Sequence, residues 1–183
     1  ESFNSIWIRD YFGNTGYKNN VDSLVMVDWI YNRPRPGDDK VAHKVSSLLN
    51  IPLYETAVNP NRLVHTGGNY MSDGLGLGFS SNLVLDENPS KSKADVDGIM
   101  NNYLGVSEYV NMTNLPYDDI HHIDMHMKLM NENTLLVGEY PTGISDGPQI
   151  EANINYVLSN YNASNGEPFN IERIDMPKGN SGG

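Results

Sequence analysis

A strand, a helix and a second strand follow one another three times along this chain, and this repeat limits the fold more than any other feature of the sequence. Short β-rich runs occupy 23–31, 81–87 and 134–141, at intervals of about 55 residues. Stretches with helical spacing follow at 38–50, 92–105 and 148–162, and further extended runs at 51–58, 106–112 and 169–176. The pattern predicts an α/β fold in which small sheets surround a pseudo-symmetry axis and the helices lie outside.

Composition narrows the class of protein. The 183 residues, 38% of them hydrophobic, suffice for one globular domain with its own core. The net charge of −11 disfavours binding to nucleic acid and to anionic membranes, and it suits cationic ligands. No apolar run is long enough to span a bilayer. The chain has no cysteine, which excludes disulfides, thiolate zinc sites and a thiol nucleophile carried by these residues.

The sequence WIRD at 7–10 places an indole, a guanidinium and a carboxylate close together. An extended backbone would direct Trp7 and Arg9 to one face of the segment and Asp10 to the other. A strand end with an arginine–aspartate surface pair fits the same residues.

The segment YNRPRP at 31–36 alternates arginine with proline. We expect the prolines to hold the segment extended, with Arg33 and Arg35 on one side. Such a pair can bind a carboxylate or a phosphate through bidentate hydrogen bonds, and a solvated loop is the alternative.

The stretch HTGGNYMSDGLGLGF at 65–79 is rich in glycine but does not match the dinucleotide fingerprint, because no helix opens directly after it. We expect Gly67 and Gly68 to let the backbone turn tightly and approach another segment or a ligand.

The stretch HHIDMHMK at 121–128 concentrates histidine and aspartate. In a strand, His122, Asp124 and His126 would share one face, as in a non-haem iron or zinc site. Three successive same-face positions span roughly 13 Å, so the pair His122 and Asp124 converges more easily on a small ligand. A polar strand face with satisfied histidines is the alternative.

Taken in order, WIRDYFG, YNRPRP, HTGGNYMSDG and HHIDMHMK resemble the bacterial, Porphyromonas-type peptidylarginine deiminases, relatives of agmatine deiminases among guanidine-modifying enzymes. The resemblance covers essentially the whole chain. It implies a pentein-type fold, a five-bladed α/β propeller of strand–helix–strand units, of which residues 1–183 would be an incomplete portion of one catalytic domain, truncated at both ends. The resemblance also favours a secreted or periplasmic location, with the cytoplasm as the alternative.

The resemblance further implies hydrolysis of a guanidinium group, in which free, C-terminal or peptidyl arginine becomes citrulline and ammonia through a covalent thiouronium intermediate. Asp10 and Asp124 would bind the guanidinium, and His122 would act as general acid and base. Trp7 would wall the pocket, and Arg33 and Arg35 would bind the substrate carboxylate. No metal or other cofactor is implied.

Three features depart from the family. Its cysteine nucleophile is missing from this chain, so a companion chain or a further segment would have to supply it. Five units of about 55 residues would need about 275 residues. Asp119 stands where relatives carry an aromatic residue. Two other functions therefore stay open: a non-catalytic guanidine-binding module, and a metal-dependent enzyme that uses His122, Asp124 and His126.

Overall fold

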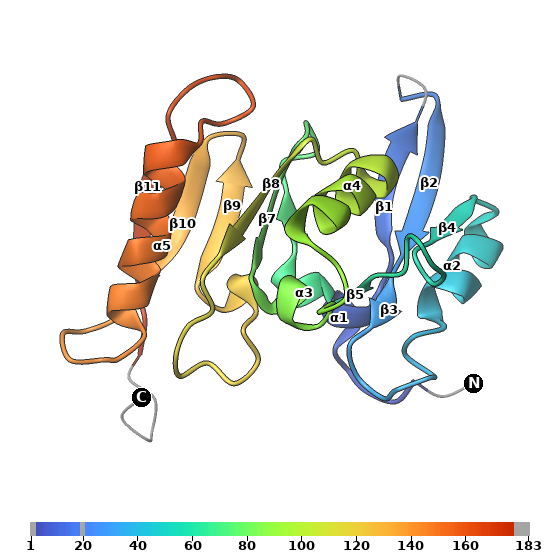
Figure 1. Cartoon of the computed structure of the whole chain (residues 1–183), viewed down its shortest axis with the longest axis horizontal. Helices are drawn as coiled ribbons and strands as arrows, with labels where there is room; N and C mark the ends of the chain where they lie inside the picture. Colours follow the sequence, from blue (N-terminus) through green and yellow to red (C-terminus); the bar gives the residue numbers. More distant parts are fainter. Residues whose placement is uncertain (1–2, 19–20, 178–183) are drawn as a thin grey trace. The chain divides into compact units, whose positions relative to one another are not determined.

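Helices are interspersed among strands along the described part of the chain (Figure 1). The computed structural model describes residues 3–18 and 21–177. Its elements are α1 (Ile8–Tyr11), β1 (Asn14–Lys18), β2 (Ser23–Asp28), β3 (Ile30–Tyr31), α2 (Val41–Leu49), β4 (Leu53–Glu55), β5 (Val64–His65), η1 (Gly67–Asn69), β6 (Met71–Ser72), β7 (Leu77–Ser81), α3 (Leu83–Asp86), α4 (Lys93–Leu104), β8 (Glu108–Met112), η2 (Ile123–Met125), β9 (Met127–Asn131), β10 (Thr134–Glu139), α5 (Gly147–Asn160) and β11 (Asn170–Asp175). No helix among these residues is long and apolar enough to cross a membrane.

Three mixed sheets share one topology. Each central strand, namely β2, β7 or β10, pairs antiparallel with the strand before it and parallel with the strand after the next long helix. The sheets are ordered β1-β2-β4, β6-β7-β8 and β9-β10-β11, and β3 pairs with β5 in a further small sheet. Parallel neighbours require a long crossover, which α2, α4 and α5 supply along the chain. The predicted α/β class and the threefold strand–helix–strand pattern are confirmed.

The helices lie close to their predicted positions, but one predicted strand is wrong. The run 81–87 contributes only Ser81 to β7, and Leu83–Asp86 forms the short helix α3. Side chains hold this turn: the Ser81 hydroxyl accepts from the Leu83 N–H at 3.2 Å, and the Asn88 amide donates to the Val84 carbonyl at 2.7 Å. The run 23–31 also breaks in two, because the ladder between β2 and β4 ends at Asp28.

The described residues form two compact units. The first comprises the chain up to Gly68 together with Val84–Ser107, and the second comprises Asn69–Leu83 together with the chain from Glu108 onward. In the first unit, Tyr11, Tyr31 and Val41 form a buried apolar cluster, with Phe12 and Val45 against it.

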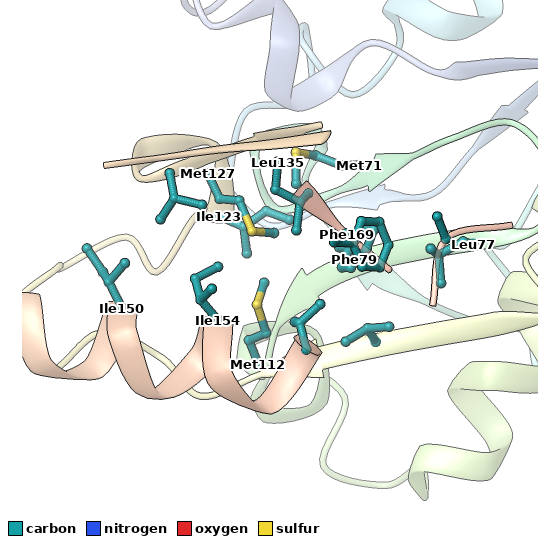
Figure 2. Packing of buried hydrophobic residues seen from close by; sticks show 14 of the residues in the cluster. Met71, Leu77, Phe79, Met112, Ile123, Met127, Leu135, Ile150, Ile154 and Phe169 are labelled. Carbon is teal, nitrogen blue, oxygen red and sulfur yellow. The ribbon is translucent and has the colours of Figure 1, made fainter. Parts of the chain in front are cut away.

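The core of the second unit lies between a helix and two sheets. Helix α5 runs alongside β10 (Figure 1) and directs Ile150 and Ile154 toward Leu135 and other buried side chains (Figure 2). Val157, on the same helix, belongs to the same buried cluster. These positions are spaced as expected for one helical face. The core also includes Ile123, which is fully buried and belongs to the candidate site segment described below.

Candidate active site

Asp10 lies on a short helix and not on the expected extended segment. Residues Ile8–Tyr11 form α1, which Trp7 precedes with 56% of its surface exposed. The Asp10 carboxylate accepts a hydrogen bond from the Gly68 N–H at 3.2 Å. A Cβ atom on Gly67 would collide with the Arg9 carbonyl oxygen, so only glycine allows the two backbones to approach so closely. The predicted close approach at Gly67 and Gly68 is confirmed, and its partner is α1.

Asp38 anchors the residues before α1. Its carboxylate accepts from the backbone N–H groups of Asn4 and Ser5 at 2.6 and 3.1 Å, and from the Ser5 hydroxyl at 2.7 Å. Burial opposes ionisation of Asp38, but these hydrogen bonds, together with the charge of Arg35, lower its pKa. Sequence reasoning missed this residue because its partners lie more than thirty positions away.

The segment from Tyr31 to Pro36 bends, and the expected extended form is wrong. The Arg35 N–H donates to the Arg33 carbonyl at 2.7 Å, and the N–H groups of Asp38 and Asp39 donate to the Arg35 carbonyl at 3.0 and 3.1 Å. These turn bonds reverse the chain, because proline fixes only φ and tolerates a turn as well as an extended segment. Arg33 and Arg35 are both half-buried.

Tyr31 links the predicted site residues of the first unit. It is 5% exposed, packs edge-to-face on Tyr11, and its hydroxyl accepts from Arg35 Nη1 at 3.2 Å. Burial raises the pKa of Tyr31, the charge of Asp10 raises it further, and the charges of Arg35 and Arg33 oppose this rise. Asp10, Arg33 and Arg35 therefore lie within electrostatic range of one hydroxyl group. Sequence reasoning missed Tyr31, although it begins the YNRPRP motif.

The segment HHIDMHMK is a turn, and its expected strand geometry is wrong. His121 has a left-handed backbone with φ of 54°, His122 precedes the 3-10 helix Ile123–Met125, and β9 begins only at Met127. The side chains therefore do not alternate between two faces. His122 is 5% exposed, whereas Asp124 is exposed.

His126 lies beyond the turn and is 7% exposed. Burial lowers the pKa of His126 to about 4, and the charge of Asp118 opposes this shift in part. Within residues 3–18 and 21–177, no three histidine, aspartate or glutamate side chains are arranged to hold a metal ion, and this includes His122, Asp124 and His126.

The predicted site residues divide between the two units. Trp7, Asp10, Arg33 and Arg35 belong to the first unit, and His122 and Asp124 to the second. The convergence of both sets on one substrate stays a prediction.

Comparisons with known proteins identify relatives of the chain. The family model for Porphyromonas-type peptidyl-arginine deiminase matches residues 1–183. A protein of Mycoplasma capricolum assigned as an agmatine deiminase is 26% identical over an alignment of 188 positions, gaps included. This alignment covers 93% of this chain and 50% of the relative. A protein of Latilactobacillus sakei with the same assignment is 27% identical over 97% of this chain and 51% of the relative. The chain thus spans about half the length of the curated relatives it matches.

Solved structures share the fold of the chain. The agmatine deiminase of Enterococcus faecalis superposes with a TM-score of 0.82 at 20% identity, over 96% of this chain and 51% of that chain. The agmatine deiminase of C. jejuni superposes with a TM-score of 0.72 at 20% identity, over 96% of this chain and 50% of that chain.

Proposed function

Because the chain belongs to the Porphyromonas-type peptidyl-arginine deiminase family, we propose that the intact protein hydrolyses a guanidinium group and converts C-terminal or free arginine to citrulline and ammonia. The observation that carries this proposal is that Arg35 donates a hydrogen bond to the Tyr31 hydroxyl, and that the charges of Asp10 and Arg33 act on the same hydroxyl. A carboxylate can bind the cationic end of arginine, and guanidinium groups can bind its carboxylate end.

The proposed mechanism starts from the difficulty of attacking a delocalised cation. Asp10 and Asp124 accept hydrogen bonds from the planar guanidinium and fix its orientation, while Trp7 packs against the substrate. A cysteine thiolate attacks the guanidinium carbon. Because this chain contains no cysteine, the thiolate comes from another segment or a companion chain.

His122 acts twice in this scheme. It first protonates the departing nitrogen, so that the carbon–nitrogen bond breaks, ammonia leaves and a thiouronium intermediate remains. It then accepts a proton from the water that attacks this intermediate. The carbon–sulfur bond breaks, which releases citrulline and regenerates the thiol.

The intact fold is proposed to be a five-bladed α/β propeller of the pentein type. Three strand–strand–helix–strand repeats lie in the present chain. This number is consistent with the coverage of about half of each relative.

A non-catalytic guanidine-binding module is the second candidate, and the absence of cysteine from this chain favours it. The two candidates differ in the remainder of the parent gene. A cysteine codon beyond the region that encodes residues 1–183 supports the enzyme, and a parent gene without one supports the binding module.

The test is ammonia release by the intact protein from a peptide with C-terminal arginine. We expect Asp10→Asn and His122→Ala each to lower kcat/KM by at least about 100-fold, the usual scale for a general acid or a charged substrate contact. Asp22→Asn and His43→Ala are matched controls, because both side chains are exposed and lie outside the proposed site. Equal activity in the site variants and in the controls would refute the assigned roles.

A further inference from the structure

A buried hydroxyl on β7 holds the chain at the start of the His122 segment. Ser81, the last residue of β7, is 2% exposed. Its Oγ donates a hydrogen bond of 2.6 Å to the carbonyl oxygen of His121, forty positions further along the chain. The contact joins the β6-β7-β8 sheet to the turn that carries His122 and Asp124.

Two further hydrogen bonds fix the position of Ser81 and the direction of its hydroxyl proton. Its backbone N–H donates to the Asn69 side-chain oxygen at 2.9 Å, and Asn69 is fully buried. The Ser81 Oγ also accepts from the Leu83 N–H at 3.2 Å. A hydroxyl has one proton to donate, and because Leu83 N–H occupies a lone pair, that proton points to His121.

The His121 carbonyl and the His122 N–H belong to one planar peptide group. A hydrogen bond to that carbonyl therefore restrains the plane from which His122 begins. His121 adopts φ of 54°, a left-handed conformation that is unfavourable for a non-glycine residue and persists only where the surroundings enforce it. The Ser81 hydroxyl is one such restraint.

The restraint extends from His121 into η2. The Met125 N–H donates to the His122 carbonyl at 3.3 Å, and the His126 N–H donates to the Ile123 carbonyl at 3.2 Å. These bonds are longer than most backbone hydrogen bonds, so the turn depends on its anchors at either end. Ile123 supplies another anchor, since it is fully buried in the core.

We propose that Ser81 is a positioning residue for His122 and Asp124, which acts through the His121 peptide group and does not touch the substrate. Its effect on turnover rests on the proposed deiminase function. Its effect on the backbone of η2 does not.

The neighbouring Ser80 provides a matched control. It is fully buried on the same strand, and its hydroxyl accepts from the Asn111 amide on β8 at 2.7 Å. Replacing either serine with alanine removes one buried hydroxyl from β7. Only Ser81→Ala removes the bond to His121.

The first experiment measures amide hydrogen exchange in the intact protein. We expect Ser81→Ala to accelerate exchange at Met125 and His126 by about tenfold, as for the loss of one buried hydrogen bond, while Ser80→Ala leaves these amides unchanged. Unchanged exchange in Ser81→Ala, or equal acceleration in both variants, overturns the proposal. Global unfolding in urea is measured for both variants, so that a general loss of stability is recognised and subtracted.

The second experiment measures ammonia release from a peptide with C-terminal arginine. We expect Ser81→Ala to lower kcat/KM about 10- to 100-fold, because small displacements of catalytic groups cost this much. We expect Ser81→Thr, which keeps the hydroxyl, to restore kcat/KM to within about threefold, and Ser80→Ala to stay near wild type. A Ser81→Ala variant with wild-type activity overturns the positioning role. A wild-type protein that releases no ammonia refutes the proposed function, and hydrogen exchange then decides the role of Ser81 alone.

Discussion

At the scale of single residues, the Asp28 carboxyl makes stability depend on pH. Burial, together with the charges of Asp39 and Glu55, raises its pKa from 3.8 to about 7, and a hydrogen bond from the Trp29 backbone opposes this rise in part. The folded state therefore binds this proton more tightly than the unfolded chain does. The contribution of Asp28 to stability is fully present below about pH 4 and is lost as the pH rises to about 7.

We expect Asp28→Asn, which cannot ionise, to be more stable than wild type at pH 8 by on the order of 1–4 kcal/mol, and the difference to disappear near pH 4. Urea unfolding at several pH values measures it. Asp22→Asn is the control, because Asp22 is exposed. A stability change in Asp28→Asn that is the same at every pH would contradict the assignment.

Tyr31 offers a test of substrate preference. Its hydroxyl orients Arg35, which is proposed to bind the substrate carboxylate. We expect Tyr31→Phe to lower the ratio of kcat/KM for a C-terminal arginyl peptide to that for agmatine, which has no carboxylate, by about 3- to 10-fold. Tyr11→Phe is the control: Tyr11 belongs to the same buried cluster, but its hydroxyl donates to the Ser5 carbonyl. An unchanged ratio in Tyr31→Phe would contradict the proposed role of Arg35 in binding the substrate carboxylate.

The candidate site residues stay a prediction from sequence, and the backbone of the motifs that carry them could not be predicted. Asp10, Arg33 and Arg35 stand in short motifs that can be read locally. Their surroundings depend on distant partners: Gly68 for Asp10 and a turn closed by Asp38 and Asp39 for Arg35. A prediction from the alternation of side chains along an assumed strand cannot take such distant partners into account. It therefore gives the wrong backbone for the segments 7–10 and 31–36.

At the scale of elements, α4 shows why helices were predicted better than turns. Ser92 and Asp95 form a capping box: the Ser92 Oγ accepts from the Asp95 N–H at 3.2 Å, and the Asp95 carboxylate accepts from the Ser92 N–H at 2.8 Å. Both partners lie within three residues, so the start of the helix is specified locally. The predicted helix at 92–105 is observed at Lys93–Leu104.

We expect Ser92→Ala to destabilise the protein by about 1 kcal/mol, because the first turn of α4 loses its cap. Ser90→Ala, an exposed change two positions earlier, should stay within about 0.5 kcal/mol of wild type. Urea unfolding followed by circular dichroism measures both variants. Equal effects would show that the capping box adds nothing beyond propensity.

Two further incorrectly predicted segments, 81–87 and 121–128, share one cause. The Ser81 hydroxyl contacts both, since it accepts from the Leu83 N–H and donates to the His121 carbonyl. One side chain thus stabilises a turn after β7 and a left-handed residue forty positions away. Hydrophobic periodicity predicts helices and strands, but it gives no signal for a side chain that stabilises an irregular backbone segment.

At the scale of the whole chain, the repeat could be predicted because each sheet depends on its own stretch of sequence. Every mixed sheet takes its three strands from one continuous stretch. The central strands β2, β7 and β10 therefore recur with the period seen in the sequence. A closed ring of such sheets would need further elements, so it remains part of the proposed function.

The net charge of −11 is a property of the whole chain, and it sets the response to salt. Raising NaCl from about 20 mM to about 500 mM shortens the Debye length from roughly 20 Å to roughly 4 Å and screens repulsion among the excess carboxylates. At pH 7 we expect the melting temperature of the 183-residue chain to rise by about 2–4 °C, which corresponds to about 1 kcal/mol.

The matched control for this salt effect is pH 4.7, the calculated isoelectric point. There the net repulsion vanishes, so the same addition of NaCl should leave the melting temperature nearly constant. An equal rise of the melting temperature at both pH values would assign the effect to apolar burial. A fall of the melting temperature at pH 7 would mean that attractive ion pairs outweigh the repulsion, such as Arg173 with Glu151 at 2.7 Å. Differential scanning calorimetry over a salt series at each pH distinguishes these outcomes, because only an effect of net charge makes the change of melting temperature with NaCl depend on pH in this way.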